Sequence, residues 1–240
     1  MSRYYPIDGL AINAARGIVK DTTIVNIFGK ALGTNSVVTT EYRTPWEVAS
    51  DYTFPTAATV VSLVSSAADT ATVLVQGLDN NWNAIQESVV LTGTTPITTT
   101  ASFLRINNAV VISGNPTGDV TLSINGGVAA KILAGTGKTQ GAYYSVPANH
   151  CFFLHRIDAF ATDSNGGKAA FFRNFVGNNV TGVNFRVAET QFFENMNIQR
   201  QLPFKYDEKQ DIKLQLKSSS GSIDGSVFVE GLLIKVPLGG

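Results

Sequence analysis

The sequence predicts an all-β protein with two β-sandwich domains, one immunoglobulin-like and one jelly-roll-like, and an extended N-terminal arm. Residues 211–217 (DIKLQLK) alternate apolar and polar side chains over one strand length. After a turn rich in Ser and Gly, residues 227–234 form a nearly all-apolar run. A period of two bounded by turn residues is typical of strands with one buried face. We therefore expect these two segments to pair as a hairpin that closes a sandwich.

The N-terminal arm is expected to span residues 1–45. Within it, residues 10–16 are compatible with one or two helical turns, and residues 22–29 are a strand candidate rich in β-branched side chains. Aromatic residues lie between Pro45 and Pro55 in the segment that follows. We expect this segment to be a packed loop, with Trp46 covering one end of a sandwich.

The first sandwich is expected to span residues 46–135 and the second residues 136–240. Short strand candidates follow one another without helical periodicity and are separated by turn residues. Asn125 and Gly126 supply the positive φ angles of a tight hairpin turn. The small, glycine-rich residues 134–138 are the best candidate for the domain boundary. The second domain has seven or eight strand candidates, which fit a jelly roll or a related two-sheet fold.

Composition argues against recruitment of nucleic acid or membrane. Charged residues make up 15% of the chain, and 18 basic residues balance 18 acidic ones, so no long-range field attracts an anionic polymer or surface. No apolar run approaches the ~18 residues of a membrane span, and the N-terminus lacks the apolar stretch of a signal peptide. The single cysteine, Cys151, excludes an intrachain disulfide and suits synthesis in the cytoplasm.

Two fragments resemble binding motifs without completing them. Residues 135–139 (GTGKT) look like the end of a phosphate-binding loop, but Ile132 occupies the position of its first glycine and strand-like residues follow. Residues 79–83 have the spacing of the first calcium ligands, whereas Ala84 and Val90 replace the required Gly and Glu. A hairpin turn explains residues 79–83 better, with weak calcium affinity left open.

Other candidate residues also favour structural roles. On one strand, Cys151 and His155 would lie roughly 13 Å apart, too far to share a metal ion. Asp207, Glu208 and Asp211 alternate with lysines, as in a solvated turn. Arginines mixed with aromatic residues over 152–200 would suit stacking on single-stranded nucleic acid or a protein interface, and the neutral net charge favours the interface. We expect no catalytic, cofactor-binding or metal site.

Several segments resemble tailed-bacteriophage virion structural proteins. They are residues 51–58 with 61–66, 76–83 with 87–93, 103–107, 144–149 and 211–214. The likeness covers residues 46–234, is strongest in the first domain and rests on fold-type patterns. It implies a non-enzymatic virion protein made in the host cytoplasm. It supports a virion component better than any particular location in the particle.

On this basis we expect a capsid cement or decoration protein that bridges capsomers. Its expected partners are other copies of itself, in a homotrimer, and the major capsid protein or other virion proteins. The alternative is a tail, collar, baseplate or fibre-attachment component. A carbohydrate-binding or carbohydrate-hydrolysing virion enzyme is a third hypothesis, for which the sequence offers no signature. The candidate residues of an intermolecular arm are Tyr4, Tyr5, Ile7, Leu10, Ile12, Ile18 and Val19.

Overall fold

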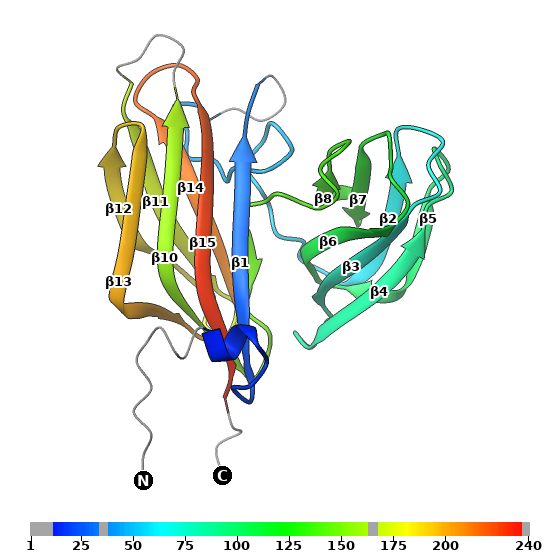
Figure 1. Cartoon of the computed structure of the whole chain (residues 1–240), viewed down its shortest axis with the longest axis horizontal. Coiled ribbons are helices and arrows are strands. Elements are labelled where there is room, and N and C mark those ends of the chain that lie inside the picture. The colour runs from blue at the N-terminus through cyan, green and yellow to red at the C-terminus, as the bar shows by residue number, and fades with distance from the viewer. Residues whose placement is uncertain (1–11, 34–37, 163–167, 237–240) are drawn as a thin grey trace.

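The computed structural model describes residues 12–33, 38–162 and 168–236, and it confirms the expected all-β fold class. Its strands form four antiparallel sheets that pack into two β-sandwiches. Figure 1 shows the two sandwiches side by side, with β1 on the flank that faces the smaller one and β12 and β13 on the opposite flank.

The larger sandwich is a jelly roll. Its strands are β1 (Thr22–Ala31), β9 (Tyr143–Ser145), β10 (His150–Thr162), β11 (Ala170–Asn178), β12 (Val183–Phe192), β13 (Asn195–Tyr206), β14 (Gln210–Ser218) and β15 (Asp224–Lys235). The two sheets have the strand orders β1-β15-β10-β13 and β12-β11-β14-β9. Eight strands in this order form the double Greek key of a jelly roll. The fully buried Phe152, Phe172 and Leu214 belong to the core between the sheets.

The expected closing hairpin is wrong in its pairing, although both of its strands exist. Strand β14 pairs with β11 and β9, whereas β15 pairs with β1 and β10 in the opposite sheet. The connection between Ser218 and Asp224 therefore crosses from one sheet to the other. Alternation along a strand indicates which face is buried, but it does not identify the neighbouring strand.

Strand β1 corrects the extent of the expected arm. Residues 22–31 pair with β15 along their whole length, from Thr22 opposite Ile234 to Ala31 opposite Gly225. The side chain of Ile27 is buried in the jelly-roll core. Residues 22–31 thus complete a jelly-roll sheet, and the smaller sandwich is inserted between β1 and β9. Hydrogen bonding to a strand about 200 positions away leaves no local signal in the sequence.

The smaller sandwich contains the strands β2 to β8. They are β2 (Thr59–Ser65), β3 (Thr72–Leu78), β4 (Ala84–Val90), β5 (Ile97–Phe103), β6 (Arg105–Ser113), β7 (Val120–Ile124) and β8 (Gly127–Ile132). The sheet orders are β5-β2-β7-β8 and β4-β3-β6. The turn at Asn125 and Gly126, with φ angles of 51° and 79°, joins β7 to β8 as the sequence predicts. The fully buried Phe103, Leu63 and Leu122 pack between these sheets.

Candidate functional site

Four aromatic side chains fill the junction between the two sandwiches. The rings of Tyr52 and Tyr143 stack with their centroids 3.6 Å apart, and Trp46 and Phe54 each meet Tyr52 edge-on at 5.0 Å. The Tyr52 and Tyr143 hydroxyls both donate hydrogen bonds to the carbonyl of Ala129 in β8, at 3.1 and 3.2 Å. Each aromatic pair contributes about 0.5–1.5 kcal/mol beyond its area burial. Trp46 is buried in this interdomain cluster. The cluster ties β9 and the segment that precedes β2 (residues 38–58, the linker) to the smaller sandwich.

A buried ion pair fastens β6 of the smaller sandwich to β14 of the jelly roll. The Arg105 guanidinium donates to both carboxylate oxygens of Asp211, from Nε at 3.0 Å and from its terminal nitrogen at 2.7 Å. Both side chains are only 6% exposed. The guanidinium also lies 4.8 Å from the centroid of the Trp82 ring. A bidentate, desolvated pair of this kind fixes orientation as well as distance.

The environment of Asp211 differs from the expected solvated turn. Asp207 is exposed and pairs with Lys205 at 2.7 Å, in agreement with that expectation. Asp211 is buried instead, and it accepts hydrogen bonds from Arg105, Ser145 and Asn179. Its principal partner lies 106 positions earlier in the chain. Counting the neighbouring lysines in the sequence could not reveal that partner.

Two further polar contacts hold the junction. Asn107 of β6 and Ser145 of β9 exchange hydrogen bonds, from the Asn107 side-chain amide to the Ser145 carbonyl and from the Ser145 N–H to Asn107 Oδ1, both at 2.9 Å. In the linker, Asp51 pairs with Lys213 of β14 at 2.7 Å. Burial acts to raise the pKa of Asp51, but hydrogen bonds from Lys213 and from the Thr44 N–H outweigh it and lower the pKa. The two sandwiches are thus joined by directional contacts over a broad surface.

Glu47 places a carboxyl group in the same buried region. Its Oε1 atom accepts a hydrogen bond from the Gln140 N–H, while Oε2 is buried without a partner among the described residues. Burial raises the pKa of Glu47 to about 7, and the hydrogen bond from Gln140 offsets only part of that effect. Glu47 therefore binds a proton more tightly in the folded protein than in the unfolded chain.

This difference predicts a specific pH dependence of stability. Between the ordinary pKa of 4.5 and the folded value of about 7, the folded state holds more protons, so stability decreases as pH rises through that window. The loss attributable to Glu47 is roughly 3 kcal/mol. Urea unfolding from about pH 5 to about pH 8 should therefore show Glu47→Gln gaining stability relative to the native protein. Parallel pH profiles for the two proteins would contradict this assignment.

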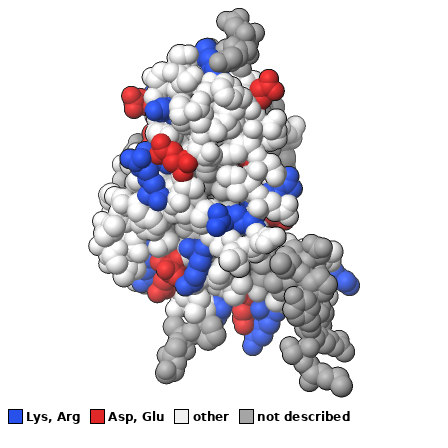
Figure 2. Space-filling model, turned by 90° about the vertical axis from the view of Figure 1, so that its left-hand side faces the viewer, with Lys and Arg blue, Asp and Glu red and all other residues white. Residues whose placement is uncertain are grey.

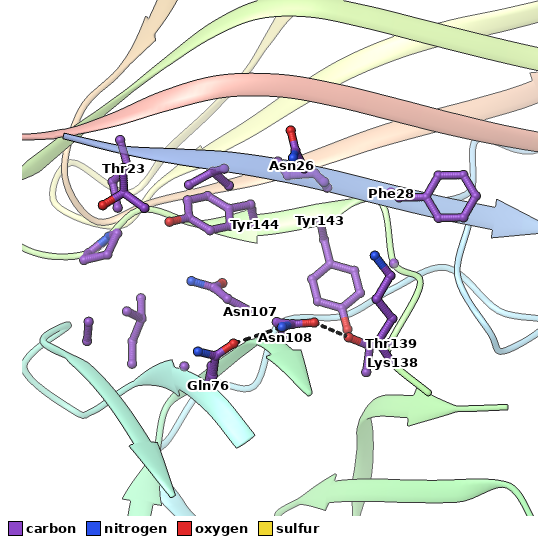
Figure 3. A pocket seen from close by; sticks show the side chains of 18 of the residues that line it. Thr23, Asn26, Phe28, Gln76, Asn107, Asn108, Lys138, Thr139, Tyr143 and Tyr144 are labelled. Carbon is purple, nitrogen blue, oxygen red and sulfur yellow. Dashed lines mark hydrogen bonds between the residues drawn. The ribbon is translucent and has the colours of Figure 1, made fainter. Parts of the chain in front are cut away.

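A cleft of about 910 Å³ opens beside the junction. One wall is β1, from Thr23 to Phe28, and the other is the outer face of the β4-β3-β6 sheet. Figure 3 shows Asn26 and Tyr144 on the jelly-roll side, opposite Gln76 and Asn108. The lining side chains are amides, hydroxyls and aromatic rings, together with aliphatic groups and Lys138, and they include no carboxylate.

The incomplete motifs of the sequence form turns and strands. Asp79 Oδ1 accepts the N–H groups of Asn81 and Asn83 at 2.8 and 2.9 Å, the side-chain-to-backbone pattern of a turn. In residues 134–138, the Gly137 carbonyl accepts the N–H of Val111 in β6, and no helix follows. Within the described ranges, no three His, Cys, Asp or Glu side chains gather as metal ligands. No helix in those ranges has the length and apolar character needed to cross a membrane.

The candidate arm residues are only partly described. Ile12 and Ile18 are 60% and 61% exposed, and Val19 is half-buried. Tyr4, Tyr5, Ile7 and Leu10 lie outside the described residues. Their role between molecules stays a prediction. On the face shown in Figure 2, which carries β12 and β13, positive and negative side chains are interspersed without a large field of one sign.

Comparisons with known proteins do not place the chain in a family. No family model matches it, and neither does any curated protein. Among solved structures, one of the infectious bursal disease virus Gx strain aligns with 91% of this chain and 77% of its own, at 11% identity and a TM-score of 0.20. T=1 particles derived from infectious bursal virus align with 91% and 79% coverage, 10% identity and a TM-score of 0.15. Overlaps this low carry no inference about this chain.

Proposed function

We propose that this chain is a non-enzymatic structural protein of a virion, and specifically a capsid cement or decoration protein that bridges the capsomers of a tailed-phage head. The observation that carries the proposal is the junction between the sandwiches. The Arg105–Asp211 pair and the Tyr52–Tyr143 stack join the two domains as one block. A bridging protein must resist separation of what it binds, and two domains on a loose linker would transmit little force.

The architecture supports the same role by analogy. Double-sheet jelly rolls recur in viral capsid domains, and also in lectins and cupins. Fold alone does not decide among these. The sequence resemblance to tailed-phage virion proteins favours the first, and the neutral, charge-poor composition suits a surface that is covered by neighbours.

The flank of the jelly roll far from the smaller sandwich offers surface for such neighbours. Among the strands that the structure describes, β12 and β13 are the outermost of their sheets, so each has one edge with no partner strand in the described part of the chain. Large apolar side chains on and between them are exposed: Val183 by 55%, Phe185 by 40%, Phe193 by 61% and Leu202 by 80%. Burying them against shell subunits or against the other copies of a trimer would contribute about 25 cal/mol for each Å² removed from water.

Cementing predicts a measurable effect on the particle. Virus particles saturated with the purified protein should disrupt at a higher temperature than particles depleted of it, because a ligand that binds the intact shell stabilises that shell. The midpoint of capsid disruption can be followed by light scattering. Equal midpoints with and without bound protein would reject the cement role.

The N-terminal segment predicts a second effect. Deleting residues 1–20 removes the candidate arm residues but leaves β1, which begins at Thr22. The truncated protein should unfold as cooperatively as the full chain. It should occupy fewer sites on the shell, as quantified on gels of purified particles. Unchanged occupancy would show that the segment does not act as an intermolecular strap.

A tail, collar, baseplate or fibre-attachment component remains the alternative, since the same rigid block would serve there. The number of copies per particle separates the two. A shell coat requires a number comparable with that of the shell subunits, whereas a tail part forms a small ring. Localisation on intact particles by electron microscopy of labelled protein gives an independent answer.

A further inference from the structure

The floor of the cleft is a row of hydrogen-bonded amides across three strands. Gln76 of β3 lies opposite Gln86 of β4 and Asn108 of β6. The Asn108 amide donates to Gln76 Oε1 at 2.9 Å, and the Gln76 amide donates to Gln86 Oε1 at 3.3 Å. Thr139 donates to Asn108 Oδ1 at 3.2 Å, which holds the end of the row. Each amide has two N–H donors, so the row retains N–H groups that no described residue accepts.

The opposite wall presents the hydroxyl group of Tyr144. Tyr144 is 8% exposed, yet its hydroxyl has no hydrogen-bond partner among the described residues. Figure 3 shows this hydroxyl in the space below β1, on the side of Thr23. Burial raises the pKa of Tyr144 above its usual range, so the hydroxyl is kept as a proton donor. The hydroxyl oxygen itself is not fully enclosed, so water or a ligand in the cleft can accept its hydrogen bond.

The amides that face the cleft lie on the smaller sandwich. Figure 3 shows Gln76, Asn107 and Asn108 there, across from Tyr144, whereas the Asn26 amide lies above β1, on the side away from them. Gln86 is exposed at the end of the amide row. The Arg105–Asp211 pair holds the two sandwiches in register beside the cleft. The polar groups of both walls are therefore fixed relative to one another before any ligand arrives.

The lining selects a class of ligand by its charge. No carboxylate lines the cleft to attract a cation, and Lys138 is the single charged residue of the lining. Amides and hydroxyls both donate and accept hydrogen bonds, as sugar hydroxyls do. The rings of Phe28, Tyr143 and Tyr144 supply apolar surface beside these groups. The volume falls within the ~300–1,000 Å³ of ligand clefts, which often lie at domain interfaces.

We propose that the cleft between β1 and the β4-β3-β6 sheet binds a neutral saccharide. Gln86, Asn108 and the Tyr144 hydroxyl hydrogen-bond its hydroxyl groups, while the aromatic rings contact its C–H faces. This activity goes beyond a structural role in the virion and does not depend on it, because the purified chain contains the complete cleft. The competing occupant is an extended peptide added to the edge of β1 that no described strand pairs with, and it would bind through its backbone.

The test uses the full-length purified protein and a panel of oligosaccharides. Neutral malto- and cello-oligosaccharides, anionic oligogalacturonates and cationic chitosan oligomers are compared by saturation-transfer NMR and calorimetry. Neutral members should bind best. Gln86→Ala and Tyr144→Phe should each weaken binding about 3- to 10-fold, the effect of losing one hydrogen bond. Tyr144→Phe removes an oxygen that has no protein partner, so its fold should be retained.

Asn195→Ala is the matched control, because Asn195 is an exposed asparagine at the start of β13, on the opposite flank of the jelly roll. It should bind like the native protein. The proposal is overturned if a broad neutral glycan array gives no signal, if charged oligomers bind better than neutral ones, or if both cleft variants bind like the control. Binding of an extended peptide to the cleft in place of the sugar, unchanged in both cleft variants, would also contradict it, since peptide pairing with the β1 backbone requires neither side chain.

Discussion

Replacing Arg105 by Ala should lower the free energy of unfolding by about 3–5 kcal/mol. The substitution leaves Asp211, which is 6% exposed, as an uncompensated charge in the junction. It also removes the cation that lies over the Trp82 ring. Urea denaturation followed by tryptophan fluorescence measures the loss, because Trp46 and Trp82 both lie near the junction.

Two comparisons make the Arg105 prediction specific. Arg186→Ala breaks an ion pair with Glu189 whose side chains are 63% and 38% exposed, and it should cost no more than about 1 kcal/mol. A double variant, Arg105→Met with Asp211→Leu, should recover much of the lost stability, because no buried charge is left unpaired. If Arg105→Ala and Arg186→Ala lowered stability equally, the ion pair would not hold the junction.

Gly29→Ala should be strongly destabilising, with a loss of about 3 kcal/mol. A Cβ atom at Gly29 would lie closer than 3.0 Å to the Ala142 nitrogen and to the Pro45 carbonyl oxygen. These two atoms form a hydrogen bond of 2.9 Å that joins the linker to the chain entering β9. Both are backbone atoms, so neither can rotate away, and β1 would have to move from the junction.

Gly127→Ala provides the control for Gly29. The nearest atom to a Cβ at Gly127 is the Ile124 carbonyl oxygen at 3.6 Å, an ordinary contact, and the residue has no positive φ angle. The free energy of unfolding of this variant, measured by thermal denaturation, should differ from that of the native protein by no more than about 0.5 kcal/mol. Equal melting temperatures for Gly29→Ala and Gly127→Ala would show that β1 is not packed against the linker as described.

Local features of the fold could be predicted from the sequence. The alternation of residues 211–217 marked β14, and Asn125 with Gly126 marked the turn between β7 and β8. Strand propensity also marked residues 22–29, most of β1. The sequence reveals these elements because alternation, turn chemistry and β-branching act over a few residues.

Long-range features could not be predicted in the same way. Nothing local shows that β1 pairs with β15, or that β14 and β15 belong to opposite sheets. In the sequence, Arg105 and Asp211 each look like a surface charge. They hold the junction because the fold brings them together as a buried ion pair. The amide row of the cleft likewise comes from three strands that the sequence order alone does not align.

The copy number of this chain in purified, intact particles tests the central proposal most directly. Mass spectrometry with isotope-labelled peptides as internal standards gives the ratio of this chain to the major shell subunit. If the chain is a cement protein, its copy number should be comparable with that of the major shell subunit. The ratio of the two should not change after extensive washing of the particles. Absence of the chain from particles, or loss on mild washing, would contradict a structural role in the virion.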